Sequence, residues 1–137
     1  AAAAHVDHVQ ARRQAGSTLK PFLYAQAIQR KILTMDSPLL DSPFSISKEG
    51  FTYRPENHDR RFMNRAIPLK EALGSSLNIP AIRAIDLVGP AQFYQLLKQL
   101  GFRLPFEEDF YGHSMALGSV DVTLAELVQG YLTLYHS

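Results

Sequence analysis

Hydrophobic residues recur at three- and four-residue steps along much of the chain, which is the spacing of amphipathic helices. Proline stands near the start of several such stretches and glycine just after the end, where helix termini favour them. Ser17 or Thr18 is placed to cap the first helix, and Thr123 with Glu126 forms a capping box at the last. The pattern predicts helices over residues 18–33, 68–74, 81–88, 90–100 and 123–137.

Alternation of apolar and polar residues indicates one β element. Residues 44–46 and 51–53 alternate on either side of a Lys-Glu-Gly turn, which predicts a small hairpin. The rest of 36–68 is rich in Pro, Ser and Asp and is predicted to be irregular, with a polar loop over 54–59 of a length that is usually functional or disordered. Residues 102–118 are also predicted to be loop. The fold class is therefore mainly α with a short β-hairpin.

Composition and charge exclude several classes of function. The 137 residues are 46% hydrophobic, and 14 Lys and Arg face 13 Asp and Glu, so nothing favours a nucleic-acid partner. Cysteine is absent, which excludes a disulfide, a thiolate metal site and a cysteine nucleophile. No apolar run approaches the roughly 18 residues of a membrane span. His5 and His8 around Asp7 are too few ligands to predict a metal, and no cofactor is predicted.

Ser17 and Lys20 form a Ser-x-x-Lys at the start of the first predicted helix. Residues three apart on a helix lie on one face, so the Lys20 amine is expected within reach of the Ser17 hydroxyl. A lysine with a depressed pKa can take the proton of a serine and make it a nucleophile, and a helix N-terminus favours negative charge on oxygen. The alternative is a capping serine and a surface lysine.

Ser76 and Asn78 form a second candidate group between two predicted helices. In a turn, residues two apart can face the same side, so these two can jointly present a hydroxyl and an amide to a substrate. Helix capping by Asn78 or Ser75 is the alternative. His113 and Ser114 suggest part of a triad with an aspartate, but no nucleophile elbow surrounds them and we do not predict one.

Residues 16–22 (Gly-Ser-Thr-Leu-Lys-Pro-Phe) and 72–81 (Ala-Leu-Gly-Ser-Ser-Leu-Asn-Ile-Pro-Ala) resemble the first two active-site motifs of penicillin-binding proteins. The Tyr-x-Pro-x-Asn-x-Asp of residues 53–59 is similar to the loop that precedes the second motif there, and residues 115–123 are similar to the segment that follows it. The residues ahead of the serine look most like the 1C branch of the bifunctional class A enzymes.

The resemblance implies the domain organisation. Residues 5–137 would be a partial transpeptidase domain, the helical part of the α+β fold shared with serine β-lactamases, with the central sheet largely missing. Residues 1–4 are interpreted as a tag remnant or as unassigned residues. The family's third motif, Lys-Thr-Gly on a strand, does not occur in the sequence and is expected downstream, so the chain alone is expected to be inactive. Asn64 stands where the family leads us to expect glycine, and Asn57 and Asp59 would brace the loop near the cleft.

The resemblance also implies the chemistry, that of a D,D-transpeptidase. Such an enzyme cross-links peptidoglycan through a serine acyl-enzyme with D-Ala-D-Ala stem peptides and is acylated by β-lactams. Ser17 would be the nucleophile and Lys20 its general base. Ser76 would pass a proton to the leaving amine, and Asn78 would hold the amide of the donor peptide.

Partners and rivals follow from the same resemblance. The partners would be stem peptides, β-lactams and the rest of the transpeptidase domain, on the periplasmic side of the bacterial inner membrane, with membrane contact only through an upstream anchor. One alternative is a serine β-lactamase or β-lactam sensor, although Glu107 and Glu108 lack the pattern expected around a deacylating glutamate. The other is a non-catalytic helical module that binds a partner through the last helix, whose Tyr131 and Tyr135 are most simply interpreted as core.

Overall fold

Helices are the main elements of the computed structural model, which describes residues 10–48, 51–57 and 61–136. Two short 3₁₀ segments, η1 (Gly16–Leu19) and η2 (Gly112–Leu117), accompany them. The α-helices are α2 (Lys20–Gln29), α3 (Leu69–Gly74), α4 (Asn78–Val88), α5 (Pro90–Gln99), α6 (Glu108–Tyr111) and α7 (Leu124–Tyr135).

The strands of the described residues form three antiparallel pairs, each of two strands. The predicted hairpin is confirmed as β3 (Ile46–Lys48) and β4 (Phe51–Tyr53), and its turn residues lie outside the described part. The other two pairs were not predicted, because two or three residues are too few to show a period. They are β1 (Arg13–Gln14) with β6 (Asp121–Val122) and β2 (Pro38–Leu40) with β5 (Ala66–Pro68).

The first helix differs from its prediction at both ends. It begins as the 3₁₀ segment η1 with no side-chain cap, and α2 ends at Gln29. The prediction that it continues to Leu33 was wrong. The amides of Ile32 and Leu33 both turn back to the carbonyl of Ala27, at 2.9 and 3.2 Å, and Lys31 has a φ of 62°. A turn, and not a further helical turn, therefore places Leu33 in the core, so the apolar residue at this position does not indicate that the helix continues.

Helices α3 and α5 confirm their predictions, whereas two other predictions need correction. Helix α4 begins at Asn78, so Pro80 lies in its first turn, where the missing N–H costs little. Residues 102–118 were predicted as loop but contain α6 and η2, because segments of four to six residues carry too little periodicity to be recognised.

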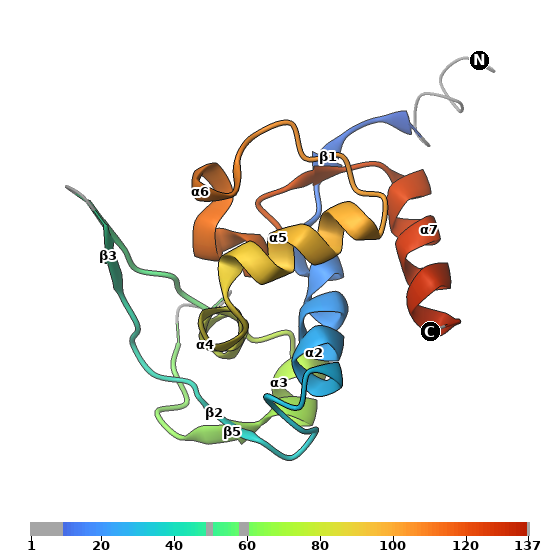
Figure 1. Cartoon of the computed structure of the whole chain (residues 1–137). Coiled ribbons are helices and arrows are strands. Elements are labelled where there is room, and N and C mark those ends of the chain that lie inside the picture. Colours follow the sequence, from blue (N-terminus) through green and yellow to red (C-terminus); the bar gives the residue numbers. More distant parts are fainter. Residues whose placement is uncertain (1–9, 49–50, 58–60, 137) are drawn as a thin grey trace, which may run out of the picture.

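Helix α4 forms the centre of the core (Figure 1). It packs against α2, against η2 and against strand β2. Seven of its residues are buried, because other elements cover the helix on most sides. This packing brings the start of α4 beside the start of α2, so that both candidate motifs lie on neighbouring helix ends.

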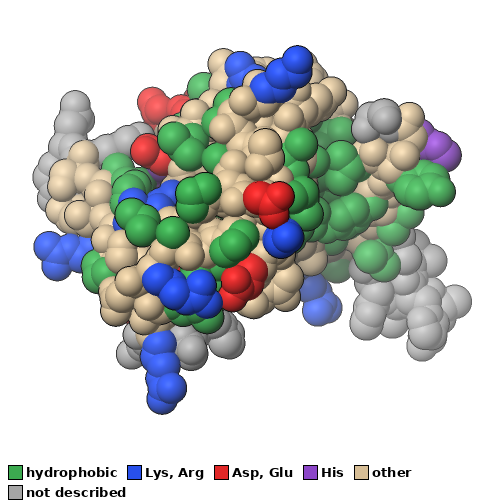
Figure 2. All heavy atoms as spheres, turned by 90° about the horizontal axis from the view of Figure 1, so that it is seen from below, with side chains coloured by type: hydrophobic (Ala, Val, Ile, Leu, Met, Phe, Trp, Pro, Cys, Tyr) green, Lys and Arg blue, Asp and Glu red, His purple; other side chains and the backbone are tan. Residues whose placement is uncertain are grey.

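Helix α7 lies at the edge of the molecule and confirms its predicted capping box, with Thr123 Oγ1 accepting from the Glu126 amide at 3.0 Å. The interpretation of Tyr131 and Tyr135 as core was wrong, since their exposed fractions are 37% and 83%. Figure 2 shows hydrophobic side chains gathered along the side on which α7 lies. We call this surface the α7 face; its exposed residues are Leu124, Val128, Tyr131, Leu132 and Tyr135.

The described residues contain no helix that is both long enough and apolar enough to cross a membrane.

Candidate active site

Ser17 lies in the 3₁₀ turn η1, and its side chain is exposed. The turn is held against the loop after η2, since the Gly16 amide donates to the Gly118 carbonyl at 3.2 Å. The two glycines approach so closely that a Cβ on Gly118 would lie 2.1 Å from both N and O of Gly16. Only glycine fits there, and the contact fixes the turn that presents the Ser17 hydroxyl.

Lys20 begins α2, and it is one of the few charged residues in the core, with an exposed fraction of 1%. Its Nζ donates to Asn78 Oδ1 at 2.8 Å, to the Ser76 carbonyl at 2.8 Å and to Ser76 Oγ at 3.2 Å. These residues are 56 and 58 positions away in the sequence. The fold therefore brings together three of the four predicted site residues.

The predicted contact between the Lys20 amine and the Ser17 hydroxyl is not among the hydrogen bonds of the described residues. Ser17 lies in η1 and Lys20 is the first residue of α2, and the backbone N–H of Lys20 donates to the Ser17 carbonyl. The hydrogen bonds of the Lys20 amine go to Ser76 and Asn78. The capping alternative for Ser17 is not observed, because η1 and α2 have no side-chain cap.

The electrostatics of Lys20 follow from its burial. All three acceptors of its amine are neutral oxygens, and no carboxylate forms an ion pair with it in the described part of the chain. Burial without a counter-charge favours the neutral amine, and desolvation lowers the pKa of Lys20 from 10.5 to about 8. A lysine of this kind can accept a proton near neutral pH.

The second motif lies in a tight connection between α3 and α4. Ser76 has a φ of 53°, the left-handed region, and Leu77 returns to an extended conformation before α4 begins at Asn78. This reversal explains how residues two apart face the same lysine, as the sequence predicted for a turn. Asn78 does not cap α4, and its side-chain Nδ2 donates to the Glu56 carbonyl at 2.9 Å.

Asn57, predicted to brace the loop, is buried with an exposed fraction of 3%. Its Oδ1 accepts from the amides of Asn78 and Ile79, at 2.9 and 3.1 Å. Its Nδ2 donates to Asp41 Oδ1 at 2.6 Å. Asp41 was missed by sequence reasoning, since it lies in an irregular stretch 16 residues away with no pattern around it. Asp59, the other predicted brace, lies outside the described residues.

Asn64 adopts a φ of 52°, the left-handed conformation that asparagine tolerates better than most residues. Its backbone N–H donates to the backbone carbonyl of Asp41 at 2.8 Å. The departure from the expected glycine is therefore accommodated at this position.

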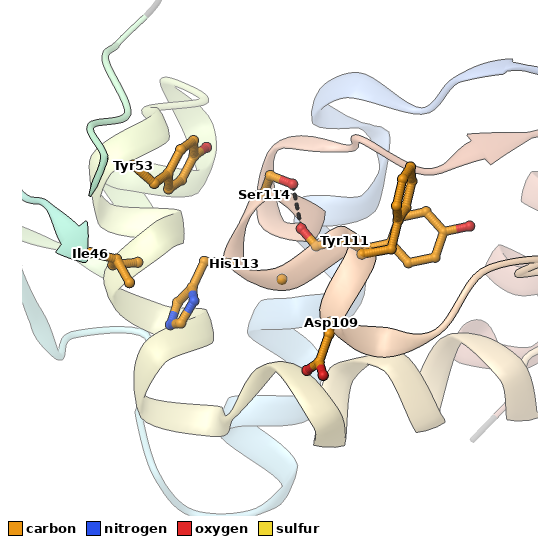
Figure 3. Close-up of a pocket in the computed structure, with 8 residues that line it drawn as sticks. Ile46, Tyr53, Asp109, Tyr111, His113 and Ser114 are labelled. Atoms are coloured by element: carbon orange, nitrogen blue, oxygen red, sulfur yellow. Dashed lines mark hydrogen bonds between the residues drawn. The ribbon is translucent and has the colours of Figure 1, made fainter. Parts of the chain in front are cut away.

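A separate pocket of about 190 Å³ lies between the β3–β4 hairpin and η2 (Figure 3). It contains His113, whose Nε2 lies 2.9 Å from Asp86 Oδ1. Ser114 Oγ donates to the Tyr111 carbonyl at 2.5 Å and pairs with Ser119 Oγ at 2.8 Å. The Ser114 hydroxyl is thus bound to groups other than His113.

The described residues contain no group of three or more His, Asp or Glu side chains suited to hold a metal ion. The pattern around His5 and His8 lies outside them, as do residues 1–4.

Comparisons with known proteins bear directly on this arrangement. The family model of the penicillin-binding protein transpeptidase domain matches residues 3–136. The chain belongs to the penicillin-binding protein transpeptidase family. The family match covers both candidate motifs and the helices that carry them.

Named relatives are class A penicillin-binding proteins. Penicillin-binding protein 1A of Haemophilus influenzae is 39% identical over 119 residues, which are 86% of this chain and 14% of that protein. Penicillin-binding protein 1C of Escherichia coli is 34% identical over 128 residues, 93% of this chain and 16% of that protein. These identities do not single out the 1C branch. The chain spans about one-seventh of the length of these relatives.

Solved structures agree on the fold. The crystal structure of penicillin-binding protein 1A from Haemophilus influenzae superposes with a TM-score of 0.79 at 38% identity, covering 90% of this chain and 18% of that one. The transpeptidase domain of Burkholderia pseudomallei penicillin-binding protein 3 gives a TM-score of 0.74 at 15% identity, covering 95% and 43%, which shows a shared fold. The chain therefore has the helical part of the transpeptidase fold, as the resemblance implied.

Proposed function

We propose that this chain forms the serine-bearing part of a D,D-transpeptidase that cross-links peptidoglycan. The observation that carries the proposal is the buried Lys20 amine, which has no carboxylate partner among the described residues and is bonded to both Ser76 and Asn78. A surface lysine beside a capping serine has no reason to be buried in this way.

The reaction has two acyl transfers. In the first, Ser17 Oγ attacks the carbonyl carbon of the penultimate D-Ala of a stem peptide, and its proton passes to the neutral Lys20 amine. Ser76 delivers a proton to the nitrogen of the terminal D-Ala, which leaves as the free amino acid, and the protonated Lys20 amine returns a proton to Ser76 through their hydrogen bond. In the second, the amine of another stem peptide attacks the ester on Ser17, forms the cross-link and restores the serine hydroxyl.

Asn78 is assigned to the amide of the donor peptide, and β-lactams are assigned to the same serine as trapped esters. Bond making at Ser17 requires an oxyanion site, to which the backbone N–H of Ser17 would give one donor and the expected Lys-Thr-Gly strand the other. The site needs no cofactor. We place the reaction on the periplasmic side of the bacterial inner membrane, where its substrate lies.

The partner of the chain is the rest of its transpeptidase domain. The α7 face exposes five large apolar side chains in one stripe, which a folded protein normally covers. The Lys-Thr-Gly strand that the sequence lacks is expected to belong to this partner. We therefore expect residues 1–137 alone to be inactive and the complete gene product to be active.

The test is labelling of the complete gene product by a fluorescent penicillin. Wild type is expected to carry a stable covalent label, and Ser17→Ala is expected to carry none. Ser75→Ala is the matched control, since Ser75 is an exposed serine next to Ser76 to which no step is assigned, and it is expected to label normally. A label that persists in Ser17→Ala overturns the assignment. A label lost within seconds favours a β-lactamase, and no label in wild type favours a non-catalytic module.

A further inference from the structure

A buried pair of polar side chains supports the start of α4 from outside the two motifs. Asp41 and Asn57 have exposed fractions of 0% and 3%, and Asn57 Nδ2 donates to Asp41 Oδ1 at 2.6 Å. The other carboxylate oxygen of Asp41 accepts from the Met63 amide at 2.8 Å. A buried carboxylate is costly unless it is hydrogen-bonded, and both oxygens of Asp41 are.

Asn57 connects this carboxylate to α4. Its Oδ1 accepts from the amides of Asn78 and Ile79, the first two residues of the helix, at 2.9 and 3.1 Å. The first amides of a helix have no partner within it, and the N-cap residue Leu77 supplies none from its side chain. Asn57 therefore caps α4 from a segment 21 residues earlier in the chain.

The orientation of the Asn57 amide is fixed by its four hydrogen bonds. The oxygen has two donors, and the nitrogen has two acceptors, Asp41 Oδ1 and the Arg61 carbonyl at 2.8 Å. Turning the amide over would place its oxygen against the Asp41 carboxylate and its nitrogen against two N–H groups. Asp41, which only accepts, thus determines which end of Asn57 faces α4.

The capped end of α4 carries the group that holds the lysine. Asn78 uses its backbone N–H for Asn57 and its Oδ1 for Lys20, at 2.8 Å. We propose that Asp41 is a positioning residue of the acyl-transfer site, acting through Asn57 to hold Asn78 and Ser76 around the Lys20 amine. The inference rests on the proposed function, and it adds a residue that belongs to neither motif.

Reciprocal substitution separates positioning from mere burial. In Asp41→Asn, the NH2 group of the new side chain must face a second donor, either Asn57 Nδ2 or the Met63 N–H. In Asn57→Asp, the carboxylates at 41 and 57 lie against each other in a buried place. In the double variant Asp41→Asn/Asn57→Asp, the amide at 41 donates to the carboxylate at 57 and accepts from the Met63 amide. The carboxylate at 57 still accepts from the two amides of α4, but its other oxygen faces the Arg61 carbonyl, where a contact between two acceptors replaces a hydrogen bond.

The experiment measures the second-order rate of acylation by a fluorescent penicillin in the complete gene product, across pH 6 to 10, together with the melting temperature. Each single variant is expected to lose about tenfold or more in acylation. The pH at which its acylation rate begins to rise is expected to increase, because water that reaches Lys20 relieves the desolvation that lowers the pKa of its amine. The double variant is expected to recover part of the rate and to move the pH profile back toward that of wild type. Leu39→Ala is the control. Leu39 is a buried residue on β2, so its replacement is expected to lower the melting temperature as the single variants do, but to leave the pH profile of acylation unchanged.

The outcomes are distinct. The inference is overturned if the single variants keep the wild-type rate and profile, if the double variant is no better than either single one, or if Leu39→Ala shifts the profile equally. If Asn57→Asp does not fold, Asp41→Asn and the double variant still decide. A Ser17→Ala protein that labels would overturn the proposed function, and the inference with it.

Discussion

Acylation of Ser17 should rise with pH and then level off, because the buried Lys20 must lose its proton before it can act as a base. With a pKa lowered to about 8, roughly one-tenth of Lys20 is neutral at pH 7 and about nine-tenths at pH 9. We therefore expect an increase of about tenfold over this interval and a plateau above it. An ordinary lysine, with a pKa of 10.5, would give about a hundredfold rise with no plateau.

The same pKa change makes a prediction for stability, with a definite sign. Between pH 8 and 10.5 the unfolded chain binds the Lys20 proton and the folded chain has lost it, so the free energy of unfolding rises with pH across that window. The full shift corresponds to about 3 kcal/mol. Below pH 8 the burial of Lys20 lowers the free energy of unfolding by this full amount, and above pH 10.5 the effect is gone. Lys20→Met should lack the rise.

Stopped-flow acylation by a fluorescent penicillin measures the first quantity, and urea unfolding at matched pH values measures the second. Lys98→Met serves as the control, since Lys98 is an exposed lysine on α5 far from the motifs in the sequence. An acylation rate that climbs tenfold per pH unit up to pH 10 would refute the argument from burial. So would a wild-type stability curve that runs parallel to that of Lys20→Met between pH 8 and 10.5.

Two further substitutions test contacts described above, both by denaturant unfolding. Gly118→Ala should destabilise the protein by at least about 2 kcal/mol and abolish penicillin labelling, because the new Cβ meets Gly16 at 2.1 Å. Gly101→Ala also replaces a glycine of positive φ, just after α5, but has open space around it and should cost only about 1 kcal/mol. Equal losses in both would contradict the close-contact argument. Thr123→Ala should cost about 1 kcal/mol by removing the cap of α7, whereas Thr123→Ser, which keeps the hydroxyl acceptor, should cost much less.

Sequence reasoning succeeded where the determining interactions are local. The capping box of Thr123 and Glu126 involves only four consecutive residues, and the structure confirms it. The glycine after α4 and the proline that opens α5 set a helix boundary in the same way. The candidate site was found because its residue types match two short motifs, and the lysine does meet Ser76 and Asn78.

The sequence was insufficient where position depends on distant parts of the chain. Asp41 lies among Ser and Pro residues, and nothing local shows that its carboxylate is buried against Asn57. The strand pair of Arg13 with Val122 joins segments more than a hundred positions apart. The apolar stripe of α7 has the spacing of a core helix, and periodicity does not say whether the covering surface lies within the same 137 residues.

The hydrogen bonds of Lys20 also have a kinetic meaning. They close loops of 56 and 58 residues, whose entropy must be lost before the contact can contribute anything. Helices such as α2 and α4 form from neighbours, but their two ends meet only after the intervening chain has found its place. We therefore expect the arrangement around the amine to form late in folding and to be lost early in partial unfolding. Under the proposed function, covalent capture by a β-lactam would therefore report the fraction of completely folded molecules, which helix content alone would not.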